Sequence, residues 1–398
     1  MTATMANVDE ALKDDYQPAI REQLRDEWML LSQIESNSTS IVGREAVLSL
    51  HVGRNSGVGA RAAGAALPAA GSQSYAESRV AVTRNYARMA IHGDLIEASN
   101  SDKGAFGRML DLEMKGALRD LKSDVSRQIF NDSTKSIAQC GTTTASTTVV
   151  LTSPTNIQLK QFHVGMKVDI GTTALFNNIV ANAEITAVDR TNGTITIDSA
   201  VTTTNSHYVT RAGSQGNELT GLRQIVDSTG TVHGVNPSTY PDWVSVEDSN
   251  SGTNRTPTEA LIGSVLDDVH FESNEEVNLI VTTRGVRNAF VATLTSQKRF
   301  TNTLALKGGF EAITISSGNI SAPIVIDNDN PANTMFLLNT ANLTHYQMGS
   351  SWSFMDRDGS TLHYVPGYDQ YEAVIYNYHQ LATDRRNAHG KILDLTEV

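Results

Sequence analysis

The chain has 398 residues, enough for two or three domains of about 150 residues each. Its composition, 39% hydrophobic and 19% charged, is that of a globular protein and excludes a disordered or collagen-like chain. The 43 acidic and 31 basic residues give a formal net charge of −12, which argues against a generally basic, phosphate-binding surface, and the single cysteine, Cys140, excludes an intrachain disulfide framework.

The N-terminal segment, residues 1–45, is expected to be an arm that carries one amphipathic helix. Pro18 suits the first turn of a helix over residues 8–35, in which apolar side chains recur at helical spacing, namely Ile20, Leu24, Trp28 and Leu31. Because this helix precedes any core, we expect Leu24, Trp28 and Leu31 to contact another surface. The N-terminus is acidic, unlike a signal peptide, and no apolar stretch could cross a membrane, so we expect a soluble protein made inside a cell, with no membrane partner.

Residues 46–95 are predicted to form a two-stranded β-arm with a mobile tip. Two strand-like runs, 46–52 and 79–91, flank a segment (53–76) in which 13 of 24 residues are Gly or Ala. So many small residues cannot build a core, and an isolated hairpin is marginal in water, so the arm should gain order by lying on another surface. The arm has five arginines, Arg54, Arg61, Arg79, Arg84 and Arg88, and two acidic residues, Glu77 and Asp94, so its net charge is +3 and that of the rest of the chain is −15. These opposite charges favour pairing between copies of the chain through the five arginines.

Residues 102–131 give the clearest helical pattern in the chain. Apolar side chains recur at steps of three and four residues and form a stripe that continues to Ile129, with Phe106, Leu110, Met114, Leu118 and Leu121 as its first members. Thirty helical residues span about 45 Å, so the helix is long enough to act as a strut.

The chain changes character after this helix. Residues 140–213 hold 17 threonines and few charges, and two alternating segments bracket Asn192-Gly193, so we expect a small inserted all-β domain. From residue 214 the pattern is α+β. The segment 256–259 reads as a capping box with Pro257 at the first helical position, and it is followed by a buried strand over 277–281 and a helix over about 284–296.

No motif in the sequence points to catalysis or to a cofactor. The glycines do not have the spacing of a phosphate loop or of a dinucleotide-binding turn. Residues 227–230 (DSTG) are one residue too long for the motif of aspartic peptidases, and we interpret them as a turn after a strand-like run over 224–226. Cys140 has no obvious local base, so a packed, idle thiol is the favoured interpretation. We therefore expect neither catalytic residues nor a cofactor.

Metal ligands are also missing from the sequence pattern. Residues 327–330 (DNDN) resemble the start of a calcium loop but lack the glycine and the glutamate that complete one, so a tight acidic turn is favoured. His51 could meet His92 across the arm, and His163 could meet His207 in the insert, but two ligands do not make a zinc site. Surface or hydrogen-bonded histidines are expected instead, and no metal.

The order of these elements resembles that of the major capsid proteins of tailed bacteriophages, whose Hong Kong phage-type shell fold also occurs in encapsulins. The matching segments are 54–99 (from RNSGVGARAAGAALPAAG to DLIEAS), 341–360 (ANLTHYQMGSSWSFMDRDGS) and 367–395 (GYDQYEAVIYNYHQLATDRRNAHGKILDL). They look like the extended loop of the family, the end of its axial domain and its closing peripheral strands. The resemblance covers nearly the whole chain except 140–213, through diffuse patterns rather than an invariant motif.

The resemblance implies an α+β fold with an extended loop over 46–95, a peripheral domain with its spine helix over 96–139, the β insert, an axial domain over 214–350 and closing peripheral strands over 351–398. It implies a structural subunit, not an enzyme, that forms hexamers and pentamers of an icosahedral virion shell around double-stranded DNA, assembled in the cytoplasm of a bacterial host. A portal protein and a cement protein are further partners that it suggests. The acidic balance suits a container that does not bind DNA by sequence.

Two departures from the family bear on these expectations. Some members link their shells covalently through a lysine of the extended loop, but no lysine occurs here between Lys13 and Lys103, so non-covalent locking is predicted. Some members carry an N-terminal scaffold that is removed by a protease, and the run before residue 46 is too short for one, so scaffolding is expected from a separate chain.

Two alternatives stay open at this stage. The Thr-rich insert would suit a carbohydrate-binding tail or adhesin protein, although Thr also merely suits an exposed sheet. An encapsulin-like compartment around enzyme cargo shares the fold, and the nature of the contents, DNA or protein, discriminates it from a virus.

Overall fold

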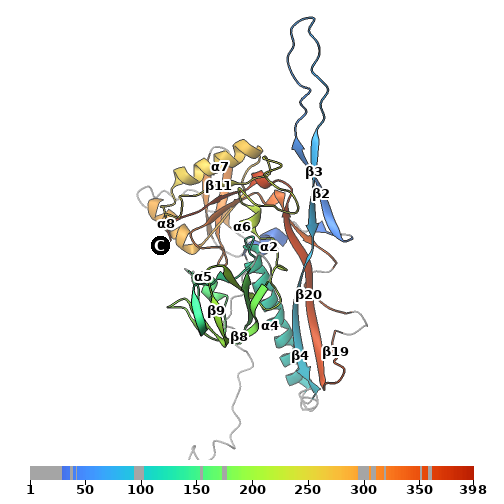
Figure 1. Ribbon diagram of the computed structural model, residues 1–398, viewed down its shortest axis with the longest axis vertical. Helices are drawn as coiled ribbons and strands as arrows, with labels where there is room; N and C mark the ends of the chain where they lie inside the picture. The colour runs from blue at the N-terminus through green and yellow to red at the C-terminus, as the bar shows by residue number, and fades with distance from the viewer. Residues whose placement is uncertain are drawn as a thin grey trace, which may run out of the picture.

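The computed structural model describes residues 29–35, 39–41, 43–93, 103–152, 156–172, 177–294, 304–305, 311–317, 320–349, 352–356 and 361–398. Within this part of the chain, an elongated body carries a long hairpin at one end (Figure 1). The body holds two six-stranded sheets and one seven-stranded sheet, together with a few helices, so the fold is α+β as the sequence indicates. No helix among the described residues is long and apolar enough to span a membrane.

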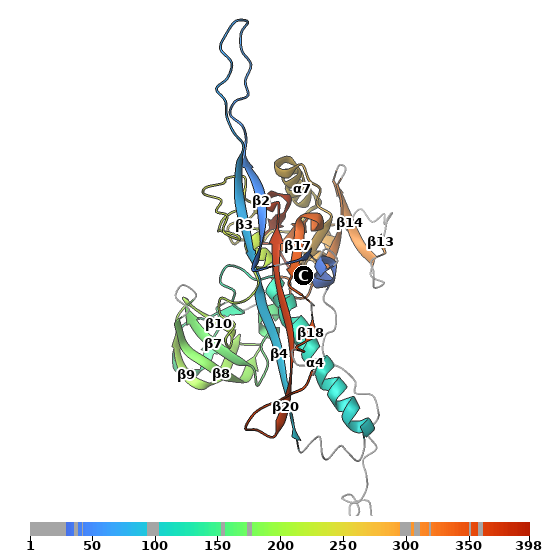
Figure 2. The same ribbon diagram turned by 90° about the vertical axis from the view of Figure 1, so that its right-hand side faces the viewer.

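The first six-stranded sheet is organised around one long strand near the C-terminus. This strand, β20 (Gln370–Thr383), is antiparallel to β4 (Thr83–His92) along ten residues. It also pairs with three short strands, β17 (Leu343–Gln347), β18 (Ser353–Phe354) and β19 (His363–Tyr364). Strand β1 (Thr39–Ser40) joins the sheet by pairing with β17. Helix α4 (Lys103–Ile129) lies along β4, beside this sheet (Figure 2).

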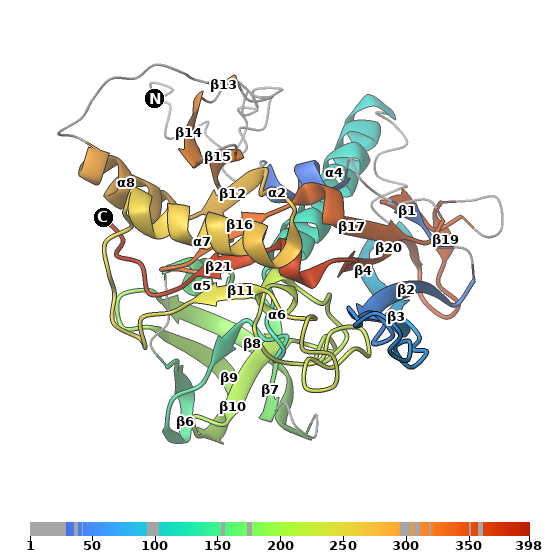
Figure 3. The same ribbon diagram turned by 90° about the horizontal axis from the view of Figure 1, so that it is seen from above.

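The seven-stranded sheet belongs to the second half of the chain. Helices α7 (Glu259–Ser273) and α8 (Arg284–Thr293) lie next to each other over this sheet (Figure 3). Its strands are, in spatial order, β11 (Val246–Asp248), β21 (Gly390–Ile392), β16 (Met335–Leu338), β12 (Leu279–Thr282), β15 (Ile320–Ile326), β14 (Glu311–Ser317) and β13 (Leu304–Ala305). The predicted strand and the helix after it thus correspond to β12 and α8.

Two local predictions in this half are wrong. The N-cap of α7 is Thr258, whose hydroxyl accepts from the backbone N–H of Leu261 at 3.2 Å, so Pro257 lies before the helix and not at its first position. The observed N-cap of α7 thus lies two residues after the one that Pro257 at the first helical position would require, Thr256. The strand-like run at 224–226 belongs in part to a short helix, α6 (Leu222–Ile225). Its two apolar residues, Leu222 and Ile225, are three positions apart and are both buried in the central core, which suits one turn of helix.

The second six-stranded sheet, with order β5-β10-β7-β8-β9-β6, comes from one continuous segment and has its own core. Its first and last strands in sequence, β5 (Ala138–Gln139) and β10 (His207–Arg211), pair with each other, so the segment begins and ends at one place. Gly193 has a φ of 65° in the turn between β8 and β9, which confirms the predicted hairpin. The other elements are β6 (Thr143–Val150), α5 (Asn156–Lys160), β7 (Lys167–Thr172), β8 (Asn177–Asp189) and β9 (Thr194–Thr203).

Three separate hydrophobic cores hold the body. One lies inside the sheet of residues 138–211, and one lies between α7, α8 and the seven-stranded sheet. The third is central and joins α2 (Met29–Glu35), through Leu30 and Ile34, to Val125 and Ile129 of α4 and to strands of both other sheets. The central core therefore fixes the two parts of the body, and α4, relative to one another.

Candidate functional site: the extended arm and the polar junction at its root

A two-stranded arm projects from the body. Strand β2 (Glu45–Gly53) pairs antiparallel with β3 (Ser74–Ala81), and neither pairs with another described strand. Residues 54–73 form the tip, which extends away from the body in both side views (Figures 1 and 2). At the tip, Val58 and Leu67 are 84% and 86% exposed. The tip has no core of its own and is available for contact with another molecule.

The base of the arm, by contrast, is anchored to the body. Leu50 is buried together with Val235 and Trp243 in a small apolar cluster that also contacts Leu48 and Val52 of β2. The backbone N–H of Arg79 donates to the carbonyl of His233 at 2.9 Å. The loop that contains Val235 and Trp243 therefore sets the position of the arm.

The structure separates the five predicted arm arginines. Arg54 and Arg61 are exposed on the tip, and Arg79 on β3 forms ion pairs with Glu77 and Glu45 of the arm, at 2.8 and 3.6 Å. Arg84 and Arg88 are exposed on β4, where Arg88 lies 2.5 Å from Glu372 of β20.

The predicted single strand over 79–91 is consequently wrong. It is two strands that meet at Val82: β3, which pairs with β2, and β4, which pairs with β20. The second pairing could not be predicted from the local pattern, because Thr83 and its partner His379 are 296 residues apart in sequence. Arg84 and Arg88 thus lie on the body, beyond the two-stranded part of the arm.

The predicted N-terminal contact residues are only partly covered. Leu24 and Trp28 lie outside the described residues, and Leu31 lies in α2. The spine helix α4 is confirmed over 103–129. The side chains of Phe106 and Leu110 are outside the described part, Met114 and Leu118 are half-buried, and Leu121 is buried, so α4 enters the core through its C-terminal half.

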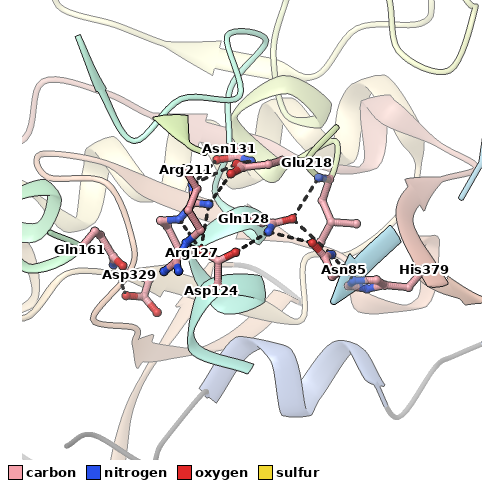
Figure 4. A network of polar contacts seen from close by, with 11 residues as sticks. Asn85, Asp124, Arg127, Gln128, Asn131, Gln161, Arg211, Glu218, Asp329 and His379 are labelled. Atoms are coloured by element: carbon pink, nitrogen blue, oxygen red, sulfur yellow. Dashed lines mark hydrogen bonds and ion pairs between the residues drawn. The ribbon is translucent and has the colours of Figure 1, made fainter. Parts of the chain in front are cut away.

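A network of buried charges lies at the C-terminal half of α4 (Figure 4). Arg127, only 7% exposed, donates to Glu218 at 2.6 and 3.0 Å and to Asp124 at 3.1 Å, and Arg211 donates to Asp124 from the other side at 3.1 Å. Burial alone would lower the pKa of Arg127 and raise that of Asp124, but the opposite charges outweigh burial and shift both in the other direction. Both groups are therefore held in their charged forms.

The same network joins separate parts of the chain. Arg211, a partner of Asp124, is the last residue of strand β10. Asp329 accepts two hydrogen bonds, from Ser126 of α4 at 2.7 Å and from Gln161, the residue after α5, at 2.9 Å. Asp329 is part of the turn that resembled a calcium loop. This turn is a buried structural link, in agreement with the acidic turn that the sequence favoured, and no cluster of metal-ligating side chains occurs among the described residues.

An open cleft of about 800 Å³ lies beside this junction, between β4, α4 and residues 211–218. Its lining carries cations, such as Arg84 and Lys135, and anions, such as Asp120 and Glu218. Charges of both signs give the cleft no preference for an anionic or a cationic ligand, and they offer complementary partners to a polar protein surface.

Two features of the junction were missed by sequence reasoning because they depend on tertiary contacts. His345 and His379 lie side by side on β17 and β20, with 2.6 Å between Nε2 and Nδ1. Arg386 is fully buried and donates to five backbone carbonyls, all from residues 224–243. Neither feature has a local motif, although the expectation of hydrogen-bonded histidines is confirmed for this pair.

The remaining sequence candidates do not form sites. His51 lies on β2 opposite Tyr75, and His92 lies on β4 opposite Gln370, so the two histidines do not meet across the arm. Cys140 is fully buried, and burial raises the pKa of its thiol to about 12, which agrees with an idle thiol.

No protein-family model matches this chain, and no curated protein matches it in sequence. Solved structures match it in fold. A chain of the capsid asymmetric unit of cyanophage A-1(L) has a TM-score of 0.64 at 15% identity, over 99% of this chain and 100% of that chain. Chains from the capsids of empty and native GTA particles have TM-scores of 0.51 and 0.50, at 8% and 10% identity, over 100% of this chain and 100% and 99% of theirs. This chain therefore has the fold of these capsid chains, which confirms the predicted phage capsid fold.

Proposed function

We propose that this chain is the major capsid subunit of a tailed bacteriophage, which assembles through its arm into an icosahedral shell around double-stranded DNA. One observation carries the proposal: residues 54–73 project from the body with Val58 and Leu67 exposed. A hairpin of this kind is marginal in water, so it gains order by lying on a neighbouring copy. The fold shared with capsid chains supports the same conclusion.

The partners follow from this role. Copies of the chain would form the hexamers and pentamers of the shell, through repeated interfaces that are individually modest and together cooperative. Scaffolding, portal and cement proteins would be separate chains, and the packaged DNA would be held without sequence-specific contacts, in a virion assembled in the bacterial cytoplasm. We propose no catalytic role, and we propose non-covalent locking of the shell.

The segments would divide this work. The N-terminal arm (1–45), with Leu24, Trp28 and Leu31, and the extended loop (46–95), with its arginines, would contact neighbours. Peripheral parts (96–139 and 351–398) would build the shell wall, an axial domain (214–350) would gather around the symmetry axes, and the insert (140–213) would stabilise the subunit from the side. The arginine contacts would be made chiefly by Arg54, Arg61 and Arg84, because Arg79 and Arg88 already have acidic partners within the chain.

Assembly of the purified protein, viewed by negative-stain electron microscopy, tests the proposal. The variant V58D/L67D should fold normally by circular dichroism but form few or no shells, because two charges would have to be buried in the arm contact. Val164 is 64% exposed on the β insert, away from the arm, and V164D provides the matched control that should assemble like the wild type.

A wild-type chain that stays monomeric at high concentration would refute the proposal, as would full assembly of V58D/L67D. The contents of the particles then separate the two uses of this fold: DNA indicates a virus, and protein cargo indicates an encapsulin-like compartment. The carbohydrate-binding alternative predicted a tail or adhesin architecture, and the capsid fold does not support it.

A further inference from the structure

Two buried histidines hydrogen-bond to each other where the arm joins the body. His345 on β17 and His379 on β20 are 2% and 0% exposed, and His345 Nε2 lies 2.6 Å from His379 Nδ1. The other ring nitrogen of His379, Nε2, lies 2.8 Å from Nδ2 of Asn85 on β4. Side chains therefore join three strands of this sheet at one point, in addition to the backbone hydrogen bonds.

A carboxylate at the far end fixes the direction of these hydrogen bonds. Asp124 can only accept, so Gln128 directs its Nε2 donor toward it at 2.8 Å, while Gln128 Oε1 accepts from the backbone N–H of Leu219 at 3.3 Å. The same Nε2 donates to Asn85 Oδ1 at 3.1 Å, which turns the Asn85 Nδ2 donor toward His379 (Figure 4). His379 Nε2 must consequently be an unprotonated acceptor.

These hydrogen bonds favour the neutral pair. The proton of His379 is on Nδ1 and donates to His345 Nε2, so the proton of neutral His345 is on Nδ1. The side-chain amide of Gln347, whose Nε2 lies 3.0 Å from that nitrogen, must then turn to present its oxygen to it. A second proton on His379 would point an N–H at the NH2 group of Asn85, and a second proton on His345 Nε2 would point an N–H at the N–H of His379. Turning the amide of Asn85 would relieve the first conflict, but it would break the hydrogen bonds with Gln128, which Asp124 and Leu219 hold in place.

The same strands hold the root of the arm. Thr83 Oγ1 donates to the backbone carbonyl of His379 at 2.7 Å, and Val82, the residue before Thr83, separates β3 from β4. Strand β3 also contacts β20. The angle between the arm and the body therefore depends on β20 remaining against β4 at His379.

We propose that the His345–His379 pair is an acid-sensitive latch: the neutral pair holds β4, β17 and β20 together at the root of the arm, and protonation releases these strands and allows the arm to change its angle. A role of the latch in shell assembly rests on the proposed function, whereas the latch itself is a property of the single subunit.

The surroundings of the pair favour its neutral form. Burial lowers the pKa of His345 to about 4, and burial together with the neighbouring His345 holds the pKa of His379 well below its usual range. No described carboxylate hydrogen-bonds to either ring, and α2, β1 and β18 present no charged side chain among those described. Apart from the pair itself, the charged or titratable groups described on α4, β4, β17 and β20 are Glu113, Lys115, Arg119, Asp120, Lys122, Asp124 and Arg127 on α4, Arg84, Tyr86, Arg88 and His92 on β4, Tyr346 on β17, and Tyr371, Glu372, Tyr376 and Tyr378 on β20.

Neither Asp124 nor Lys122 on α4 favours an imidazolium. Asp124 is already paired with Arg127 and Arg211, at 3.1 Å each. Lys122 Nζ lies 5.5 Å from the centre of the Trp352 ring, and the centroid of that ring is 6.0 Å from the centroid of the His379 ring. Through this contact, the positive charge of Lys122 opposes protonation of the His379 ring. Release of the strands exposes the rings to water, where a histidine has an ordinary pKa of about 6.5.

Hydrogen–deuterium exchange of the unassembled full chain, between pH 7 and pH 5, tests the latch. A site whose pKa rises from about 4 to 6.5 on release increases the opening equilibrium by about 20-fold over this range. After correction for the intrinsic pH dependence of exchange, we expect protection of residues 83–92 to fall by at least this factor. Protection of residues 194–203, which belong to the separate core of the β insert, should change much less.

Substitution distinguishes this pair from the other histidines. In the variant H345Q/H379N, which replaces both rings by side chains that do not titrate, protection of residues 83–92 should no longer depend on pH, whatever its value at pH 7. H51Q, which changes an exposed histidine on β2, should keep the full pH response. An equal loss of protection in the wild type and the double variant would overturn the proposal.

A second measurement holds even where the double variant does not fold. Nuclear magnetic resonance titration of the wild-type imidazoles should show both rings neutral at pH 6, and rings that titrate near pH 6.5 without any change in protection of residues 83–92 would refute the latch. Both measurements use the free subunit, so failure of the latch and failure to form shells are separate outcomes.

Discussion

Arg386 offers the sharpest test of how the body holds the arm. Its side chain is fully buried, and its guanidinium donates to the carbonyls of Gln224, Ile225, Thr229, Gly230 and Trp243, at distances between 2.5 and 3.2 Å. Burial lowers its pKa to about 10, so it remains a cation at neutral pH. The carbonyl of Trp243 belongs to the residue that packs against Leu50 of the arm, so loss of Arg386 should loosen both the loop and the arm.

The expected magnitude follows from counting donors. Methionine at position 386 removes the donor from five carbonyls, two in buried hydrogen bonds and three in part-buried ones, and at about 1 kcal/mol for each the loss is roughly 5 kcal/mol at most. Lysine has three N–H donors, so R386K leaves at least two carbonyls unsatisfied, and the loss is about 2 kcal/mol. The matched control is R385M: Arg385 is the exposed neighbour and pairs with Glu275 at the surface, where such a pair contributes about 0–1 kcal/mol.

Urea unfolding followed by tryptophan fluorescence measures these differences, because Trp243 is a buried residue of the loop itself. We expect the unfolding midpoint to decrease in the order wild type, R385M, R386K, R386M, with an unchanged slope against urea. A free energy of unfolding of R386M within about 1 kcal/mol of that of R385M would refute this account, and so would equal losses for lysine and methionine, because the account depends on the number of donors.

Three further predictions address the body. G221A should destabilise the protein by about 3 kcal/mol in the same assay, because an added Cβ would lie 2.2 Å from the backbone nitrogen of Asn131. His389 is fully buried and burial lowers its pKa to about 4, so the unfolded chain binds more protons at this site below pH 6.5. The stability that wild type loses between pH 7 and pH 4.5 should therefore exceed the loss in H389Q by about 2.5 kcal/mol. The buried Cys140 should react with a thiol reagent at least about 100-fold more slowly in the folded protein than in urea, and equal rates would contradict its burial.

The sequence predicted the elements whose pattern is local. The apolar stripe of α4, the turn at Asn192-Gly193 and the small-residue tip of the arm each lie within one short segment, and each was found close to its predicted place. In contrast, the division of the expected strand at Val82 was missed, because β4 takes its partner from the other end of the chain. Pairing over such a distance leaves no periodic signal.

The buried polar residues were missed for a related reason. Arg386 reads as a surface residue, since its partners are backbone carbonyls that any sequence supplies. His345 and His379 share a strand pairing that is visible only after β17 and β20 are aligned. Asp329 was noted only as part of a loop that resembled a calcium site, and its actual partners come from α4 and from the segment after α5. Satisfaction of buried polar groups is decided by the tertiary fold.

The pairing of β5 with β10 has a consequence for how this subunit can vary. The 138–211 segment leaves and rejoins the parent chain at neighbouring positions, and among the described residues its apolar interior shares no side chain with the other cores, so a lineage can gain, lose or exchange it in a single genetic event. The parent framework would need to accommodate only two adjacent chain ends, together with the loss of the partners that the segment supplies to Asp124 and Asp329, namely Arg211 and Gln161. For an engineer, this joint is a natural attachment point for foreign domains.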